Sequence, residues 1–397
     1  MPDLLMAASA RTSGMVADIG ELVRAESPTA DVAAVRRCAE KVAGLGSRLT
    51  GTHPERLESG GRPHLRWRFG AGDRVLLLGH FDTVWPVGAL ATHPFAVTDG
   101  RMTGPGCFDM KAGLVQIFHA LALLDDLDGV TVLATSDEET GSGTSRALVE
   151  SEARRVGAVL VLEAGEDGAL KTARKGVSTY DLRIGGKAAH AGLEPHRGVN
   201  AAVELAHQIQ AVAALGDPAA GTSVTPTVAS AGTTRNTVPD AAELLVDVRA
   251  TTTAEQVRVD AAVRALRPAL PGARLEVTGG PDRAPLQEAS SAGLFALASR
   301  LYGELGLGTL KGVAVGGGSD GNLTAGVGTP TLDGLGAVGG GAHADHEHVI
   351  VAELPRRTAL LAALVRELTA RPSDPERHAH SGADTAARTT DHAGETA

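Results

Sequence analysis

Three short apolar runs constrain the fold of this chain most strongly. They are RVLLLGH (74–80), VTVLATS (130–136) and AVLVLEA (158–164), and each has the length and composition of a buried β-strand. Segments with helical periodicity follow the first run at 111–124 and the second at 145–155. Strands that alternate with helices predict an α/β fold with a mixed, mostly parallel sheet covered by helices on both faces.

The pattern of elements changes near residue 175. Beyond that point the order is strand, helix, strand, strand, helix, strand, which is the ferredoxin-like order of an α+β domain. The expected strands lie at 178–186, 227–232, 242–250 and 273–280, and the expected helices lie at 199–215 and 253–266. We therefore predict that residues 175–284 form a small domain inserted into the α/β domain.

The α/β domain is predicted to consist of two segments, 1–174 and 285–371. Further helices are expected over 14–44, 291–304 and 351–368. Residues 372–397 contain almost no large apolar side chain, so we expect this tail to be disordered.

Charge and cysteine content exclude several classes of protein. The formal net charge of -10 opposes contact with phosphate backbones, so nucleic acid is not an expected partner. Two cysteines, Cys38 and Cys107, are too few for a disulfide framework or a Cys-based zinc site. The sequence has no apolar run of about eighteen residues and no recognisable targeting segment, so membrane insertion is not expected. We therefore expect a cytoplasmic protein.

Acidic and histidine side chains follow each of the three apolar runs. His80 and Asp82 come at the end of the first run, Glu138 and Glu139 follow the second in TSDEETGSG, and Glu163 ends the third. Open α/β sheets bind ligands at the carboxyl ends of their strands, and imidazole and carboxylate groups both bind zinc. Each motif by itself could equally be a solvated loop, because a polar residue at a strand end needs no metal.

Two further motifs supply the same kinds of side chain. GPGCFDMKAG places Asp109 just before a helix, where it could instead be the N-cap. GGGAHADHEHV contains His343, His346 and His348, any of which could simply be exposed to solvent. Together the motifs offer enough ligands for two divalent cations about 3.5–4 Å apart. Since the ligand types are His, Asp and Glu, zinc is favoured, with cobalt or manganese as possible substitutes.

Eight motifs in this order resemble the M20 metallopeptidase family. They are GHFDTV, GPGCFDMKAG, SDEETGS, LEAG, GKAAHAGLEPHRGVNA, RNTVPDAAELLVDVRA, GGGSDGN and AHADHEHV, and the resemblance covers about residues 15–370. Within the family the chain is most similar to the glutamate carboxypeptidase (carboxypeptidase G2-like) branch. The resemblance implies a zinc-exopeptidase-like catalytic domain, made of the two α/β segments, and an inserted lid and dimerisation domain.

The resemblance also implies a role for each residue of the expected centre. The five metal ligands would be His80 and Glu163 on one zinc ion, Glu139 and His343 (with His346 or His348 as alternatives) on the second, and Asp109 as the bridge. Asp82 would orient the ring of His80, and Glu138 would be the general base for the attacking water.

The inserted domain is implied to complete the site. His190 would reach the oxyanion of the reaction, usually from the partner subunit, so a homodimer is expected. Asn236 and Arg249 would bind the substrate and its carboxylate, and Ser319 would line the pocket. Two alternatives stay open, because Arg249 could form a salt bridge on a strand face and His190 could be an ordinary loop histidine.

The activity implied by the resemblance is hydrolysis of an amide bond next to a free carboxylate. Glu138 would take a proton from water and pass it to the leaving amine. Expected substrates are peptides or N-acyl amino acids, with glutamate as a possible product. The alternatives are an N-acyl amino acid deacylase of a biosynthetic pathway and, less favoured, a non-catalytic binding protein. A further family feature is a cis peptide bond, expected here between Asp109 and Met110.

Overall fold

The computed structural model describes residues 2–370, so the tail predicted to be disordered, 372–397, lies outside the described residues. The described chain divides into two compact units. The first comprises residues 2–172, 288–313 and 319–370, and the second comprises residues 173–287 and 314–318.

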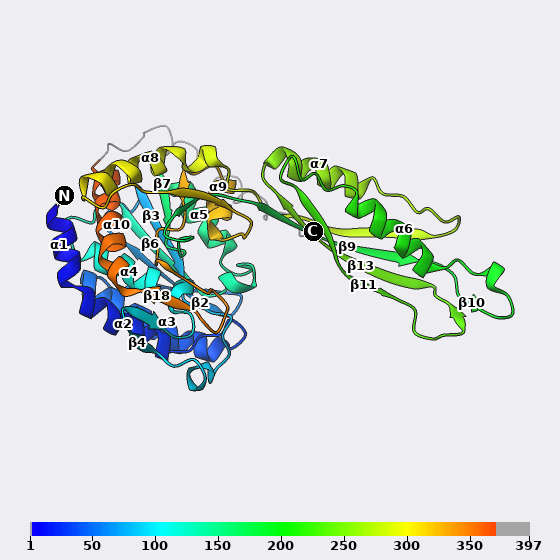
Figure 1. Cartoon of the computed structure of the whole chain (residues 1–397), viewed down its shortest axis with the longest axis horizontal. Helices are drawn as coiled ribbons and strands as arrows, with labels where there is room; N and C mark the ends of the chain where they lie inside the picture. The colour runs from blue at the N-terminus through cyan, green and yellow to red at the C-terminus, as the bar shows by residue number, and fades with distance from the viewer. Residues whose placement is uncertain (1, 371–397) are drawn as a thin grey trace, which may run out of the picture. The chain divides into compact units, whose positions relative to one another are not determined.

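A six-stranded sheet forms the centre of the first unit (Figure 1). Its strands, in spatial order, are β1 (Glu55–Ser59), β2 (Arg62–Arg68), β6 (Val130–Thr135), β3 (Val75–His80), β7 (Ala158–Val161) and β16 (Thr331–Leu332). Strands β6, β3, β7 and β16 are parallel, whereas β1 and β2 form an antiparallel edge. The mixed, mostly parallel sheet predicted from the sequence is therefore confirmed.

Helices cover both faces of this sheet. Leu77 and Val132 point into the main core, which contains side chains of α1 (Pro2–Ala10), α2 (Thr12–Arg24), α3 (Val32–Thr50), α4 (Ala112–Leu121), α8 (Glu288–Glu304) and α10 (Leu354–Thr369). Leu76 and Leu133 point into a second core, with side chains of α5 (Arg146–Arg155) and α9 (Asp320–Gly326). Successive residues of a strand point to opposite faces, so continuous apolar runs are what a sheet buried on both sides requires.

The N-terminal region differs from the expected helical segment over 14–44. The structure has two helices there, α2 and α3, separated by residues 25–31. Pro28 lies in this break, where it has no N–H to give to a helix. The side chain of Asp31 then accepts a hydrogen bond from the Ala34 N–H and caps α3.

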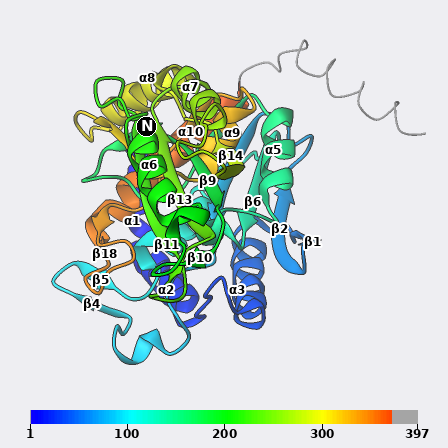
Figure 2. The same cartoon turned by 90° about the vertical axis from the view of Figure 1, so that its right-hand side faces the viewer.

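The second unit has the strand and helix order predicted for residues 175–284. Its elements are β9 (Gly176–Gly185), α6 (Ala201–Ala213), β11 (Ser223–Ala231), β13 (Ala241–Ala250), α7 (Thr253–Arg264) and β14 (Arg274–Arg283). The sheet order is β11-β13-β9-β14, with every neighbouring pair antiparallel. Tyr180, Leu182 and Leu244 on one face of this sheet share a core with both helices. Figure 2 shows α6 lying along β11 and β13.

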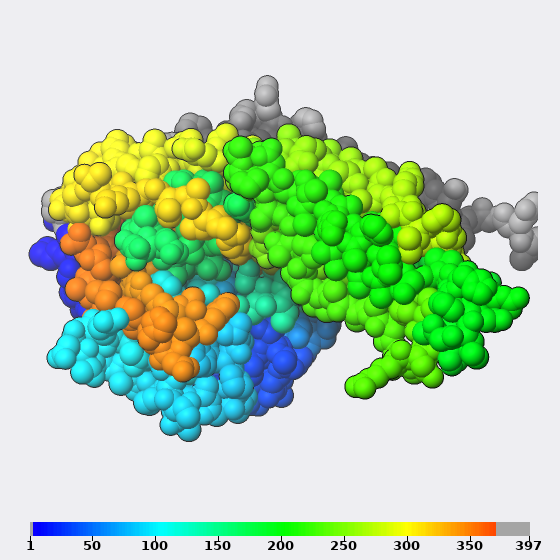
Figure 3. All heavy atoms as spheres, turned by 45° about the vertical axis from the view of Figure 1, so that its right-hand side comes forward, coloured from blue at the N-terminus to red at the C-terminus, as the bar shows by residue number. Residues whose placement is uncertain are grey.

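Short strands complete both units. In the first, β17 (Gly339–Gly340), β18 (His348–Ile350), β5 (Arg101–Thr103) and β4 (Ala96–Thr98) form an antiparallel ribbon. Figure 3 shows the segment around 340–350, in orange, lying against the cyan segment that contains β5. In the second unit, β10 (Ala189–His190) pairs with β12 (Thr237–Val238), and elsewhere β8 (Leu170–Arg174) pairs with β15 (Gly312–Val315).

The described residues contain no helix that is both long enough and apolar enough to cross a membrane. Cys38 and Cys107 are buried free thiols.

Candidate metal centre

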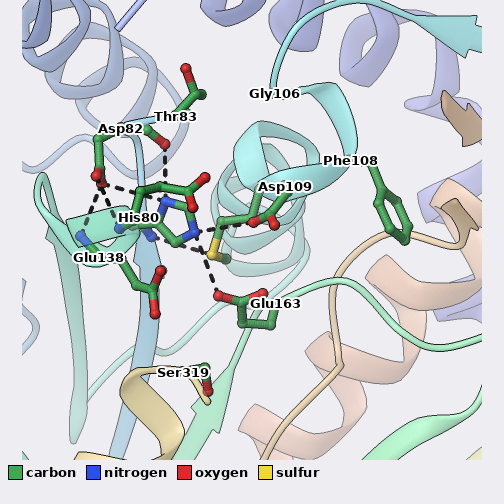
Figure 4. A network of polar contacts seen from close by, with 12 residues as sticks. His80, Asp82, Thr83, Gly106, Phe108, Asp109, Glu138, Glu163 and Ser319 are labelled. Carbon is green, nitrogen blue, oxygen red and sulfur yellow. Dashed lines mark hydrogen bonds and ion pairs between the residues drawn. The ribbon is translucent and has the colours of Figure 1, made fainter. Parts of the chain in front are cut away.

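The candidate centre lies at the carboxyl ends of β3, β6 and β7. His80 is the last residue of β3, Glu138 and Glu139 form a short 3-10 turn after β6, and Glu163 follows β7 by two residues. Because these strands are parallel neighbours, their ends meet at one edge of the sheet. Figure 4 shows one ring nitrogen of His80 facing the side chains of both Asp109 and Glu163, with Glu138 nearby.

Asp109 connects the two histidines of the centre. Its Oδ1 lies 3.2 Å from His80 Nε2, and its Oδ2 lies 3.3 Å from His343 Nε2. His80 Nε2 is also 3.5 Å from Glu163 Oε1, and His343 Nε2 is 3.1 Å from Glu139 Oε2. Each imidazole therefore faces one oxygen of Asp109 and one glutamate, which is the pairing implied for two metal ions bridged by a carboxylate.

The spacing of these atoms fits bound cations. Ligand atoms at zinc–nitrogen and zinc–oxygen distances in a tetrahedral site stand about 3.4 Å apart. Potential ligand atoms of His80, Asp109 and Glu139, and of His80, Glu138 and Glu163, lie within 4.8 Å of one another. His80 Nε2, Asp109 Oδ1 and Glu139 Oε1 are buried without a hydrogen-bond partner of good geometry. A cation bound among them would satisfy all three atoms.

The electrostatics of the centre favour added positive charge. Burial alone would lower the pKa of His80, yet the neighbouring carboxylates of Asp109, Asp82 and Glu163 raise it well above its ordinary value. Hydrogen bonds to Asp109 and Glu139 raise the pKa of His343 to about 10. Burial raises the pKa of Glu139. Without metal the histidines are therefore driven to hold protons among crowded carboxylates, and divalent cations would replace those protons.

Asp82 has a different main contact from the one expected. The nearest acceptor for His80 Nδ1 is the main-chain oxygen of Asp82 at 3.0 Å, while the carboxylate Oδ1 is 3.5 Å away. A proton on Nδ1 leaves Nε2 free to bind metal. The carboxylate of Asp82 instead accepts hydrogen bonds from the Glu138 and Glu139 N–H groups and from Thr29 Oγ1. Asp82 therefore holds the turn that carries both glutamates.

The loop of Asp109 is not a helix cap. The N-cap position of α4 belongs to Lys111, no side chain caps it, and Asp109 has the extended angles φ -116° and ψ 97°. The peptide bond between Asp109 and Met110 is cis, as expected. The carboxylate of Glu347 accepts hydrogen bonds from three main-chain N–H groups of this loop. Glu347 was not among the predicted site residues, although its place in the motif of His343 was a possible signal.

The Glu138–Glu139 turn has a second set of contacts. Asp320 accepts hydrogen bonds from the hydroxyls of Ser142 and Thr135, on either side of the turn. Asp137 accepts hydrogen bonds from the Thr144 N–H and hydroxyl. These buried carboxylates, like Glu347, were not foreseen, because their partners are main-chain groups and hydroxyls that carry no metal motif.

The remaining predicted residues have mixed placements. Ser319 is buried as the N-cap of α9, where its hydroxyl donates to Asp333 and accepts from the Gly321 N–H. The expectation that Ser319 lines the pocket did not include these contacts. Arg249 makes a two-point ion pair with Asp247 on β13, the strand-face alternative.

The other histidines of the GGGAHADHEHV motif lie elsewhere. Among residues 2–370, His343 is the one of the three that contacts Asp109 and Glu139. His348 Nε2 is 2.8 Å from the Arg101 guanidinium, and His346 is exposed.

The tip of the second unit brings His190 and Asn236 together. His190 pairs with Thr237 in the β10–β12 ribbon, and the Ala191 N–H donates to the Asn236 carbonyl. His190 is exposed, and its Nδ1 accepts hydrogen bonds from two main-chain N–H groups. A neutral His190 therefore carries its proton on Nε2.

A family model and a related sequence identify the same protein family. Residues 76–367 match the family model described as Peptidase family M20/M25/M40. The chain is 34% identical to Carboxypeptidase G2 of Pseudomonas sp. (strain RS-16) over 388 residues, which cover 92% of each chain.

Solved structures show the same fold. The aminopeptidase PepT of Bacillus cereus has a TM-score of 0.72 at 23% identity, covering 90% of this chain and 99% of its own. The M20 family metallo-carboxypeptidase Sso-CP2 of Sulfolobus solfataricus has a TM-score of 0.68 at 15% identity, and the match covers 89% of this chain and 99% of Sso-CP2.

Proposed function

The chain belongs to peptidase family M20/M25/M40 and is a hydrolase of the metallo-carboxypeptidase and amidohydrolase type, and we propose that it is a dinuclear zinc enzyme cleaving an amide bond next to a free carboxylate. The product would be a C-terminal amino acid, possibly glutamate, released from a peptide or an N-acyl amino acid. The observation that carries the proposal is the position of Asp109, whose two oxygens face His80 and His343 separately. The 34% identical relative is a carboxypeptidase, which supports this substrate class.

Five side chains would hold the metal pair. His80 and Glu163 would bind one zinc ion, His343 and Glu139 the other, and Asp109 would bridge them. Zinc supplies Lewis-acid chemistry, which lowers the pKa of water and polarises an amide carbonyl. Cobalt or manganese could substitute, since both accept nitrogen and oxygen ligands.

Glu138 is the residue proposed to move the proton. A carboxylate oxygen of Glu138 is within 4.8 Å of ligand atoms of His80 and Glu163, while Asp82 holds its main-chain N–H. It would accept a proton from the attacking water and then give that proton to the departing nitrogen. One carboxylate serves both steps because the water and the departing nitrogen attach to the same carbon.

The second unit is proposed as the lid and dimerisation domain, with His190 acting in the partner's site. Its Nε2–H would donate to the oxyanion, Asn236 would bind the substrate, and Arg249 would bind the carboxylate. Arg249 pairs with Val177 and Ala241 with Gly185, and the eight residue steps from Ala241 to Arg249 span about 27 Å. His190 lies beyond the Ala241 end, so one copy of the unit could not place it and Arg249 on one small substrate.

The edge of the second sheet supports a homodimer. Strand β11 lies at the edge of the order β11-β13-β9-β14, and most of its residues are exposed, including Val228. An unpaired edge with exposed apolar side chains suits pairing with a second copy.

The proposed location is the cytoplasm. The free buried thiols of Cys38 and Cys107 agree with a reducing compartment.

The proposal is tested by screening N-acyl amino acids and dipeptides with the zinc-loaded protein. We expect release of an amino acid with a free carboxylate, loss of that activity after chelation and its return with zinc. Hydrolysis at an undiminished rate by metal-free protein would overturn the mechanism. For the dimer, His190→Ala and Glu138→Ala subunits, each inactive alone, should recover turnover when mixed, and no recovery despite proven subunit exchange would overturn action in trans.

A further inference from the structure

We propose that Glu347 is a positioning residue that fixes the loop of Asp109 in its metal-binding conformation before any metal is bound. The inference rests on the proposed function for the importance of Asp109, but it concerns a side chain that would not touch the metal. Glu347 is the fourth residue after His343, and the proposed role requires no bond between its carboxylate and a metal ion.

Both oxygens of the Glu347 carboxylate are used by neighbouring donors. Oε1 accepts from the Phe108 N–H at 2.9 Å and the Asp109 N–H at 3.1 Å. Oε2 accepts from the Gly106 N–H at 2.9 Å and from Trp85 Nε1 at 2.7 Å. Glu347 is 0% exposed, so water cannot replace these contacts. Three of the four donors are main-chain groups of the loop that carries the bridging carboxylate.

The loop needs acceptors from outside because of its conformation. Gly106 has a φ of +69°, and Asp109 and Met110 have non-helical angles, so helical hydrogen bonds do not satisfy these N–H groups. Gly106 also has no room for a side chain, since an added Cβ would lie 2.3 Å from Thr83 Cγ2. A buried N–H without an acceptor is costly, and Glu347 provides acceptors for three of them.

The arrangement requires a carboxylate and not only a side chain of the same shape. In Glu347→Gln the amide keeps one acceptor oxygen and places an NH2 group against two N–H donors, whichever way it is turned. The loop would then shift to relieve the clash and Asp109 would move with it. Residues that orient metal ligands typically change metal affinity by about 10- to 100-fold when replaced.

A matched control is available in the same unit. Glu152 is a buried carboxylate, 2% exposed, which accepts hydrogen bonds from Arg66 and Arg68. It lies on α5 and pairs with Arg66, Arg68 and Arg155, none of which belongs to the Asp109 loop. Glu152→Gln therefore makes the same chemical change and should lower stability without moving Asp109.

The test measures zinc affinity and main-chain exchange in the full chain. Competition with a chromophoric chelator should show affinity 10- to 100-fold weaker for Glu347→Gln and within threefold of native for Glu152→Gln. In metal-stripped protein, hydrogen exchange of the Gly106, Phe108 and Asp109 amides should be slow in the native chain and in Glu152→Gln, and fast in Glu347→Gln.

Any of three results overturns the inference. The first is native zinc affinity in Glu347→Gln. The second is an equal loss of affinity in both variants, which would mean a general effect of stability. The third needs no variant and applies even if Glu347→Gln does not fold: fast exchange of the three amides in native metal-stripped protein would show that metal, and not Glu347, orders the loop. If the native chain binds no zinc at all, the proposed function fails instead, and slow exchange would still identify the loop as preformed.

Discussion

Replacing Asp82 by asparagine separates the two jobs that the structure gives this residue. The main-chain oxygen that contacts His80 Nδ1 is unchanged by the substitution, whereas the carboxylate that holds the Glu138–Glu139 turn is lost. Since Asp82 is 0% exposed, no water can take the place of the missing oxygen. The variant therefore reports on the turn, with the His80 contact kept.

The size of the effect follows from the contacts. The carboxylate accepts from Thr29 Oγ1 at 2.7 Å and from the two N–H groups at 3.3 Å each. In either orientation the asparagine NH2 faces one of those N–H donors. The unsatisfied buried N–H and the weakening of the remaining hydrogen bonds together should lower the free energy of unfolding by about 3 kcal/mol. That corresponds to a fall in Tm of roughly 6–12 °C for a unit of this size.

Thermal melting of metal-stripped protein and zinc competition together provide the assay. We expect Asp82→Asn to lose about 3 kcal/mol of stability and about 10- to 100-fold in zinc affinity. Thr29→Val removes one hydroxyl donor and leaves the turn intact, so it should cost only about 1 kcal/mol and leave zinc affinity within threefold. Native zinc affinity in Asp82→Asn would refute the argument that this carboxylate positions the turn.

Four further predictions concern the proton, the metal, the pH dependence of stability and the packing. Glu138→Gln should keep both zinc ions while kcat falls at least about 100-fold, as metal analysis and steady-state kinetics would show; undiminished kcat would remove Glu138 as the base. Because the pKa of His343 is about 10 without metal, zinc must displace its proton, so zinc affinity should rise as pH rises toward 10, with proton uptake by buffer seen in calorimetry. The same raised pKa stabilises the folded metal-free chain fully below about pH 6.5, and that contribution should disappear as pH rises through about 10. Gly113→Ala places a Cβ 2.1 Å from the Leu162 carbonyl oxygen, so α4 or the end of β7 must move, with a stability loss of about 1–3 kcal/mol in melting experiments; a native Tm would contradict the close approach.

The main strands could be predicted because their burial on both faces leaves a continuous apolar run. The hairpin β1–β2 could not, since β1 is ERLES and most of its side chains are exposed. Only Leu65 and Trp67 of β2 reach the main core as large apolar residues. An edge hairpin of this kind shows too little apolar alternation for a strand prediction.

The candidate centre was predictable to the extent that its side chains follow strands. His80 and Glu163 take their positions from β3 and β7, whose parallel direction was expected from the alternation of strands and helices. The supports of the centre were not predictable, because they join residues far apart in the sequence. Glu347 binds N–H groups some 240 positions away, and nothing in either local sequence specifies that contact.

Ser319 is a second residue whose contacts the local sequence did not determine. Its motif suggested contact with substrate, whereas the hydroxyl is occupied by Asp333 and by the Gly321 N–H. A Ser followed by Asp and Asn also fits a helix start, and the capping box with Asn322 is what the structure contains. Local sequence allowed both outcomes, and only the position of Asp333 distinguishes them.

Anomalous diffraction from a zinc-loaded crystal would locate the metal ions themselves. We expect two zinc peaks per chain, one beside His80 and Glu163 and one beside His343 and Glu139, with an oxygen of Asp109 toward each. A single peak, or two peaks that leave Asp109 unbound, would contradict it.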